Sequence, residues 1–183
     1  MIMKLDEIDL KILKILQANG RITNSDLAKQ VGLSPPPVLE RVKKLEKSSI
    51  IKSYVALVDP LAVGFETLTF VEVILNWHKK DMVTKFINEI RKIDEVLECH
   101  HITGSADFLL KIVVKNIPAY EELVLNKLLD LPSIQHLRTM VVLSTPKSNT
   151  ALNLKEAQKK RRIKKADKRF MFKNQNALRS NIL

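Results

Sequence analysis

The order of strand-like and helix-like patterns between residues 67 and 143 constrains the fold most strongly. Some segments are rich in β-branched residues, with apolar residues at alternate positions, whereas others repeat an apolar residue every three or four positions. The strand-like segments are 67–75, 96–103, 108–114 and 134–143, and the helix-like segments are 81–93 and 118–131. The order strand-helix-strand-strand-helix-strand predicts a split βαβ unit, which is a ferredoxin-like α+β domain.

One face of such a sheet is covered by both helices, so the other face must be wetted or covered by a partner. The residues that we expect on this second face are Phe70, Glu72, His101 and Met140. Because this mixture is largely apolar, we expect a partner on this face, most simply a second copy of the chain related by two-fold symmetry.

Two short amphipathic helix patterns precede the sheet. The first runs from Leu5 to Leu16 with a wide apolar stripe, and Asn19-Gly20 is expected to end it, with glycine in a left-handed conformation. The second follows Thr23, where an acid three residues later, Asp26, gives a variant of the capping box.

A third helix pattern follows the tight turn at residues 32–34. Its apolar stripe is Val38, Val42 and Leu45, and its opposite face is charged. Two short helices separated by a glycine-containing turn of about three residues are typical of a helix-turn-helix unit, whose second helix enters the major groove of DNA. The periodicity alone leaves open a small packing domain whose charged face is only solvated.

Three consecutive prolines, residues 35–37, open this third helix. A capping side chain at Ser34 would need an N–H group that the second helical residue, also a proline, lacks. Each of the first two prolines is also pushed away from helical angles by the proline after it. We therefore expect residues 34–36 to be extended or tightly turned and regular helix to begin near Pro37. Further along, β-branched and aromatic residues predict a strand over 52–58, which Asp59-Pro60 ends.

Several of these residues resemble the motifs of the Lrp/AsnC family, most closely those of its leucine-responsive branch. In the N-terminal part the matching residues are Asp9, Gly20-Arg21-Ile22, Leu27-Ala28, Val31-Gly32-Leu33-Ser34-Pro35, Pro37 and the run ERVKKLE at 40–46. In the sheet part they are Leu97-Glu98-Cys99-His100, Thr103-Gly104, Asp107, the run FLLK at 108–111, Leu131-Pro132 and Arg138-Thr139. The family usually has a small or hydroxyl residue where this chain has Pro36.

The resemblance implies a transcriptional regulator without enzymatic activity, with a winged-helix-like helix-turn-helix domain and a domain for effector binding and assembly. In the family, a Gly-x-x-Asp turn helps to form a small-molecule site, usually for an amino acid, at a contact between dimers. The resemblance therefore assigns Gly104 and Asp107 to an effector site, with Thr103, Ser105 and Ala106 as its backbone or wall. From the residues alone, the alternative is that Gly104 only closes the turn and Asp107 only caps it.

The third helix supplies the candidate contacts to double-stranded DNA. We expect Arg41, Lys43 and Lys44 to contact phosphates or bases, and Ser34, Val38 and Glu40 to line the groove. Homodimers that assemble into higher homo-oligomers would place paired helices on half-sites about one helical turn, or a multiple of it, apart.

The positive charge of the chain is concentrated at its C-terminal end. The sequence has 31 Lys+Arg and 20 Asp+Glu, a net charge of +11, of which residues 147–183 hold 12 basic and 2 acidic side chains, or +10. We expect three parts: a DNA-binding domain at 1–60, an effector and oligomerisation domain at 61–146 and a basic tail at 147–183. The tail would add nonspecific phosphate contacts, which weaken as salt rises; a solvated tail is the alternative.

Other classes of function remain open or are disfavoured. An architectural DNA-compacting protein with tail-dominated binding is the alternative function, and a sensor or enzyme subunit that has lost DNA binding is a third. The single cysteine, Cys99, excludes an intramolecular disulfide, and the adjacent His100 and His101 of one strand point to opposite faces, which disfavours a shared metal. No phosphate-binding loop or nucleophile motif is present, so we expect no catalytic residue and no cofactor beyond an amino-acid effector. The sequence has neither an apolar run of membrane-spanning length nor a secretory signal, which indicates a cytoplasmic protein.

Overall fold

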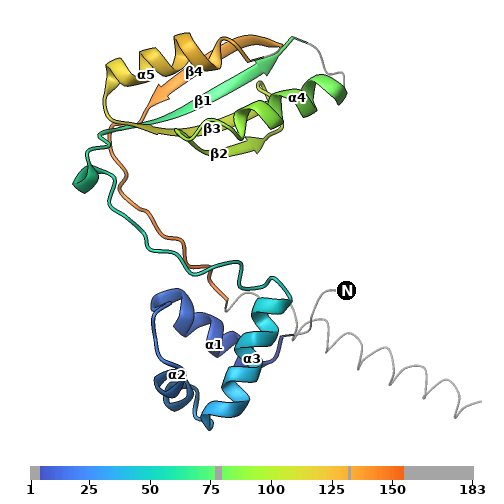
Figure 1. Cartoon of the computed structure of the whole chain (residues 1–183), viewed down its shortest axis with the longest axis vertical. Coiled ribbons are helices and arrows are strands. Elements are labelled where there is room, and N and C mark those ends of the chain that lie inside the picture. Colours follow the sequence, from blue (N-terminus) through green and yellow to red (C-terminus); the bar gives the residue numbers. More distant parts are fainter. Residues whose placement is uncertain (1–4, 77–79, 132, 155–183) are drawn as a thin grey trace, which may run out of the picture. The chain divides into compact units, whose positions relative to one another are not determined.

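The computed structural model describes residues 5–76, 80–131 and 133–154, and they form two compact units (Figure 1). One unit contains the described residues up to Ala56 together with those from Ser148 onward, and the other spans Leu57–Lys147. Each unit has its own hydrophobic core. The segment from Ser148 therefore groups with the N-terminal unit, which nothing local in its sequence indicates.

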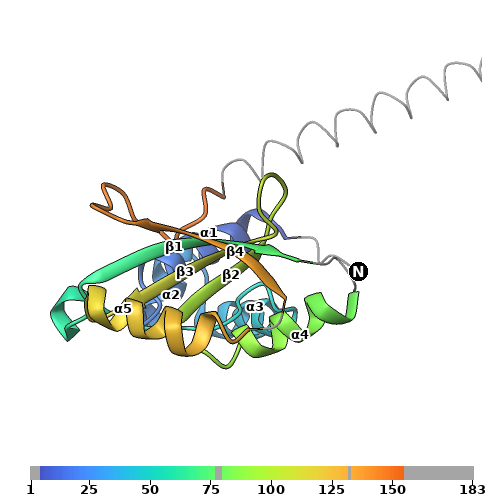
Figure 2. The same ribbon diagram turned by 90° about the horizontal axis from the view of Figure 1, so that it is seen from above.

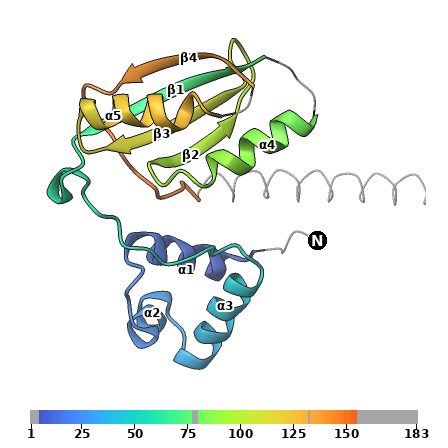
Figure 3. The same ribbon diagram turned by 45° about the horizontal axis from the view of Figure 1, so that its top comes forward.

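The first unit contains three helices, α1 (Glu7–Ala18), α2 (Asn24–Val31) and α3 (Pro35–Lys47), which pack around one core (Figure 3). The buried residues of this core come from all three helices and are Ile12, Leu13, Leu27, Ala28, Val31, Val38, Val42 and Leu45. The apolar stripes predicted for the three helices thus meet one another, as expected for a helix-turn-helix unit.

Side chains cap two of these helices. At the start of α1, Asp6 Oδ1 accepts the N–H of Asp9 and Asp9 Oδ2 accepts the N–H of Asp6, both at 2.8 Å. At the start of α2, Thr23 Oγ1 accepts the N–H of Asp26 at 3.1 Å and its hydroxyl donates to the Asp26 carboxylate at 2.7 Å. The cap predicted at Thr23 is confirmed.

Gly20 and the triple proline differ from expectation. Helix α1 ends at Ala18 with Asn19 as an extended C-cap, and Gly20 is not in the left-handed conformation that was expected. A Cβ on Gly20 would lie 3.4 Å from the ring of Tyr54, which is an ordinary contact distance. Helix α3 begins at Pro35, not near Pro37, and Ser34 makes no side-chain cap. The N–H groups of a first helical turn have no intrahelical partner, so prolines there lose no hydrogen bond, and their fixed φ already suits a helix.

The second unit contains four strands and two helical segments, and it follows the predicted order. The elements are β1 (Thr67–Leu75), α4 (Lys80–Ile90), β2 (Val96–His101), β3 (Phe108–Val114), α5 (Ile117–Leu123), which continues as a π-helical turn over Val124–Leu128, and β4 (Ile134–Val141), after a short 3₁₀ turn at Leu61–Val63. The strands lie in the order β2-β3-β1-β4 with antiparallel neighbours. Both helices cover the same face of the sheet (Figure 2), so the ferredoxin-like prediction is confirmed.

No strand forms at residues 52–58, where one was predicted. The segment has no ladder partner among the described residues, and Val55, Leu57 and Val58 are each more than 60% exposed. High β propensity reflects packing against neighbouring strands, so a segment without a neighbour is not held in a sheet. The predicted helices at 81–93 and 118–131 are also shorter, ending at Ile90 and Leu128.

The face of the sheet opposite the helices carries Phe70, Glu72 and Met140, as expected. His101 does not belong to this face, because it is paired with Phe108, which is buried beneath the helices, and the two rings stack with centroids 4.8 Å apart. Opposite residues of antiparallel strands share a face. His100 therefore replaces His101 on the open face, opposite Leu109. No helix within the described ranges is long and apolar enough to cross a membrane.

Candidate functional site

Helix α3 presents its charged side outward while its apolar side is buried. Glu40, Lys43 and Lys44 are exposed, and Ser34 is exposed immediately before the helix. Val38, which was expected to line a groove, is 0% exposed and lies in the core of the first unit. That expectation was wrong, because Val38 forms the buried face of α3 together with Val42 and Leu45.

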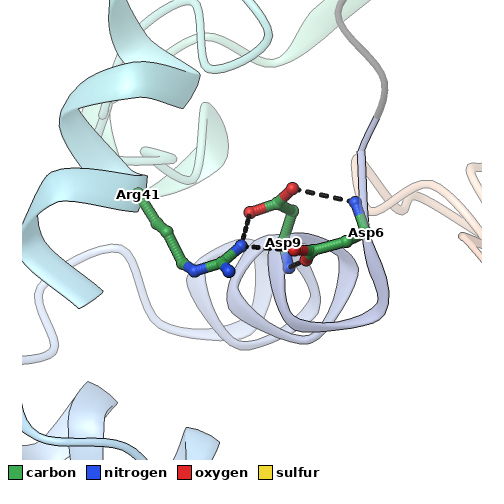
Figure 4. Close-up of polar contacts among 3 residues, drawn as sticks. All are labelled: Asp6, Asp9 and Arg41. Atoms are coloured by element: carbon green, nitrogen blue, oxygen red, sulfur yellow. Dashed lines mark hydrogen bonds and ion pairs between the residues drawn. The ribbon is translucent and has the colours of Figure 1, made fainter. Parts of the chain in front are cut away.

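Arg41 also differs from the other cationic residues of α3. Its Nη1 lies 2.6 Å from Asp6 Oδ2 and 2.7 Å from Asp9 Oδ1 (Figure 4), and the Asp9 side chain is only 8% exposed. The guanidinium thus joins α3 to the first turn of α1. It is held by two carboxylates of its own domain, where sequence reasoning expected it to face DNA.

The electrostatics of this cluster agree with its geometry. Hydrogen bonds from Arg41 to Asp6 and Asp9 raise the pKa of the guanidinium above its ordinary value. Partial burial acts to raise the pKa of the Asp6 carboxyl, but the N–H of Asp9 and the guanidinium outweigh it and lower that pKa below its ordinary value. The sequence contains one local signal for this cluster, the Asp-x-x-Asp spacing before an apolar run, which is a capping pattern. The partner on α3 has no such local signal.

The cations of α3 that remain directed outward are Lys43, Lys44 and Lys47. A lysine ammonium is a flexible point charge suited to phosphate, whereas the carboxylate of Glu40 could accept a hydrogen bond from a cytosine amino group. The prolines at 35–37 lack N–H groups, so the start of α3 offers fewer backbone donors to an anion than an ordinary helix start.

The loop between β2 and β3 contains the predicted effector residues. Thr103, Gly104 and Ser105 are exposed, whereas Ala106 is only 6% exposed and forms part of the buried base of the loop. Gly104 has a φ of +130°, and, apart from its two chain neighbours, no heavy atom of the described residues lies within 4 Å of the position that a Cβ would take. Glycine is therefore required here by the backbone angle, and the space beside it is open.

Asp107 fixes this loop to the sheet. Its Oδ2 accepts the N–H of Leu75 at 2.8 Å, its own N–H donates to the carbonyl of Val73 at 3.0 Å, and its carbonyl accepts the N–H of Ile102 at 2.9 Å. These bonds join the loop to the end of β1. The Asp107 side chain therefore bonds to β1, whereas the turn itself is closed by the backbone bond between Ile102 and Asp107.

A metal centre has no basis in the described part of the chain. Across residues 5–76, 80–131 and 133–154, no three His, Cys, Asp or Glu side chains are grouped closely enough to hold a metal ion. Cys99 is half-buried, and this burial raises the pKa of its thiol, which lowers its reactivity.

Comparisons with known proteins match both units. The family model described as winged helix-turn-helix DNA-binding matches residues 5–52, and the model described as the Lrp/AsnC ligand binding domain matches residues 68–152. The leucine-responsive regulatory proteins of Escherichia coli K12 and Salmonella typhimurium are each 42% identical over 151 residues, which are 82% of this chain and 92% of each relative.

Solved structures agree with the sequence relatives. A transcriptional regulator from Neisseria meningitidis, solved in complex with L-Met, superposes with a TM-score of 0.80 at 38% identity and covers 84% of this chain and 99% of that chain. An AsnC family regulator from Agrobacterium tumefaciens gives a TM-score of 0.79 at 32% identity and covers 83% and 99%. This chain belongs to the Lrp/AsnC family of transcriptional regulators.

Proposed function

We propose that this protein regulates transcription by binding specific sites in double-stranded DNA through α3, and that an amino acid bound at residues 103–107 changes its assembly or its affinity for DNA. The observation that carries the proposal is the division of α3 into three sides. Its apolar side is buried, Arg41 is tied to α1, and Lys43 and Lys44 point outward. The helix is thus fixed in its domain with a cationic side available. The protein would act in the cytoplasm.

The DNA contacts that we propose are Lys43 and Lys44 on phosphates, with Ser34 and Glu40 near base edges. The N-terminal part of the second helix of a helix-turn-helix unit reaches base edges; Ser34 is exposed immediately before α3, and Glu40 is exposed in its first half. Arg41 is a positioning residue in this scheme, because it acts through Asp6 and Asp9.

Salt dependence of duplex binding tests this assignment. Each lysine that neutralises a phosphate contributes a slope of about −0.9 to the logarithm of affinity against the logarithm of salt concentration. We expect Lys43→Gln and Lys44→Gln each to reduce the slope by about 0.9, measured by fluorescence anisotropy on a labelled duplex. Lys92→Gln, an exposed lysine of the second unit, is the charge-matched control. Unchanged slopes in both α3 variants would show that α3 does not lie on DNA.

The effector site is supported by the match to the ligand-binding domain family and by the L-Met complex of the Neisseria regulator. In this chain, the exposed Gly104 permits close approach of a ligand, and the carboxylate of Asp107 can accept a charge-assisted hydrogen bond from an ammonium group. Such a ligand would shift assembly only as far as its affinities for the competing states differ.

A thermal-shift screen against the twenty amino acids tests the effector site. A ligand that binds the folded protein raises its apparent stability by mass action, by about 2.7 kcal/mol at one hundred times its Kd. We expect at least one amino acid to raise the Tm, and Asp107→Asn to reduce that shift, while Asp130→Asn, an exposed aspartate of the same unit, leaves it unchanged. No shift with any amino acid would leave residues 103–107 as a turn only.

Assembly is supported by the open face of the sheet. This face combines apolar residues with an ion-pair group in which Glu98 lies 2.8 Å from Lys111 and 2.9 Å from His100. An uncovered face of this mixed character suits an isologous contact with a second copy. We propose homodimers that assemble further, and sedimentation velocity tests this; a monomer at every concentration would contradict it.

A further inference from the structure

The chain from Ser148 onward returns to the first unit and is held on α1. Gln17 binds the backbone of Leu152 with both ends of its amide: its Nε2 donates to the Leu152 carbonyl at 3.3 Å and its Oε1 accepts the Leu152 N–H at 2.7 Å. Two residues later, Leu154 is partly buried against the core of α1, α2 and α3. We call this contact, Gln17 with Leu152 and Leu154, the C-terminal anchor.

The anchor has the features of a specific attachment. The amide of Gln17 satisfies both the backbone donor and the backbone acceptor of one residue, Leu152, as a neighbouring strand would. Leu154 adds apolar burial. Just before the anchor, Asn149 Oδ1 accepts the N–H of Ala151 at 2.8 Å, which closes a turn in the backbone. The anchored segment and α1 together line a groove with Leu10 and Lys14 on the α1 side.

The sequence beyond the anchor is strongly cationic. Residues 155–183 contain 11 Lys+Arg and 2 Asp+Glu, a net charge of +9, and the run Lys159-Lys160-Arg161-Arg162 follows Leu154 within about five residues. A chain spans at most about 3.3–3.6 Å per residue, so this run begins within about 17 Å of the anchor.

We propose that the C-terminal anchor tethers residues 155–183 to the DNA-binding unit as a cationic arm, which contacts phosphates flanking the site bound by α3. This inference rests on the proposed function, because it needs α3 on duplex DNA. The anchor raises the effective concentration of the arm near DNA that is bound by α3, because it attaches the arm to the same unit as α3.

The effect of the anchor on DNA affinity depends on the length of chain that tethers the arm. With the anchor, the tether of the first basic run is about 5 residues long, counted from Leu154 in the unit that contains α3. Without it, the tether lengthens to about 12 residues, counted from Lys147, the last residue of the second unit. Effective concentration falls roughly as the −3/2 power of tether length, so loss of the anchor should weaken arm-dependent binding by about three- to fourfold.

A double-mutant cycle on the full chain tests the arm. The two changes are Gln17→Ala, which removes the anchor amide, and the fourfold substitution K159Q/K160Q/R161Q/R162Q, which neutralises the first basic run. Gln135→Ala, an exposed glutamine of the second unit, is the matched control. The probe is a labelled random-sequence duplex of about 40 base pairs, titrated by anisotropy at several NaCl concentrations. The Lys43→Gln variant, measured on the same duplex, gives the contribution of α3 to binding separately.

The neutralised run should reduce the salt slope by about 3.6, at 0.9 for each of four phosphates. Gln17→Ala should weaken binding by about three- to fourfold when the run is charged and by a smaller factor when the run is neutral, because fewer of the tethered charges then remain. Gln135→Ala should bind as the wild type does, and Leu154→Ala should repeat the Gln17→Ala pattern.

Three results would overturn the proposal. An equal loss from Gln17→Ala in both backgrounds would mean that the glutamine acts through folding. If Gln17→Ala does not weaken binding in either background, although neutralising the basic run does reduce the salt slope, the arm is not tethered at Gln17. An unchanged slope after neutralisation would mean that the run does not contact DNA. By contrast, failure of the proposed function would show as loss of the Lys43→Gln effect or of duplex binding by the wild type.

Discussion

The Arg41 cluster gives the sharpest stability prediction. In Arg41→Gln, the carboxylates of Asp6 and Asp9 would face each other without a cation, and Asp9 is only 8% exposed. Breaking a buried ion pair costs about 3–5 kcal/mol, whereas an exposed pair contributes about 0–1. Because Arg41 is 30% and Asp6 50% exposed, the cluster lies between these limits. We expect the first unit to lose about 2 kcal/mol of unfolding free energy.

Native-state hydrogen exchange of α1 and α3 measures this loss within the first unit alone. A loss of about 2 kcal/mol should speed exchange of the protected amides about 30-fold. Lys44→Gln is the matched control, because it removes one positive charge from an exposed position of the same helix; it should change stability by less than about 0.5 kcal/mol. If the two variants exchange at the same rate, the ion pairs of Arg41 do not hold α3 against α1.

The pH dependence of the same variant provides an independent check. The pKa of Asp6 is lowered in the folded protein, so its contribution to stability is present above the unfolded value, about 3.9, and is lost as pH falls through the folded value. The stability difference between wild type and Arg41→Gln should therefore be constant near neutrality and narrow below about pH 4. A difference that widens on acidification would refute the assignment.

Three further substitutions test the packing. Val38→Ala should cost about 2 kcal/mol in urea unfolding, because the side chain is fully buried, and a near-zero cost would mean that it is not in the core. Thr69→Val should raise stability by about 1 kcal/mol, because the buried Thr69 hydroxyl has no partner among the described residues; destabilisation would show that a partner exists. Gly104→Ala should lower the Tm at a cost of about 1–2 kcal/mol, from its φ of +130°, and an unchanged Tm would mean that the loop adopts another conformation.

Strict patterns in the sequence were sufficient for much of the fold. The alternation of β1 and β3 is visible in their residues, and both strands have the predicted bounds, 67–75 and 108–114. Apolar spacing was less reliable at helix ends. Ile93 fits the period of α4 and is buried, yet the helix ends at Ile90, because a buried residue can also be supplied by the turn that follows.

The site was less predictable, because its details depend on contacts distant in sequence. The charge pattern identified the outward lysines of α3 but could not separate them from Arg41, whose partners lie 32 and 35 residues away on α1. The contact of Gln17 with Leu152 spans 135 residues and has no local pattern at all. In contrast, the cap at Thr23 was predictable, since both of its groups lie within one helical turn.

The most direct measurement is a structure of the protein bound to a duplex enriched by the protein from random sequence. We predict that the outward side of α3 lies in the major groove with Lys43 and Lys44 nearest the phosphates, while Arg41 stays bonded to Asp6 and Asp9. A complex in which α3 lies away from the duplex, or in which Arg41 leaves the two carboxylates to bind DNA, would contradict this account.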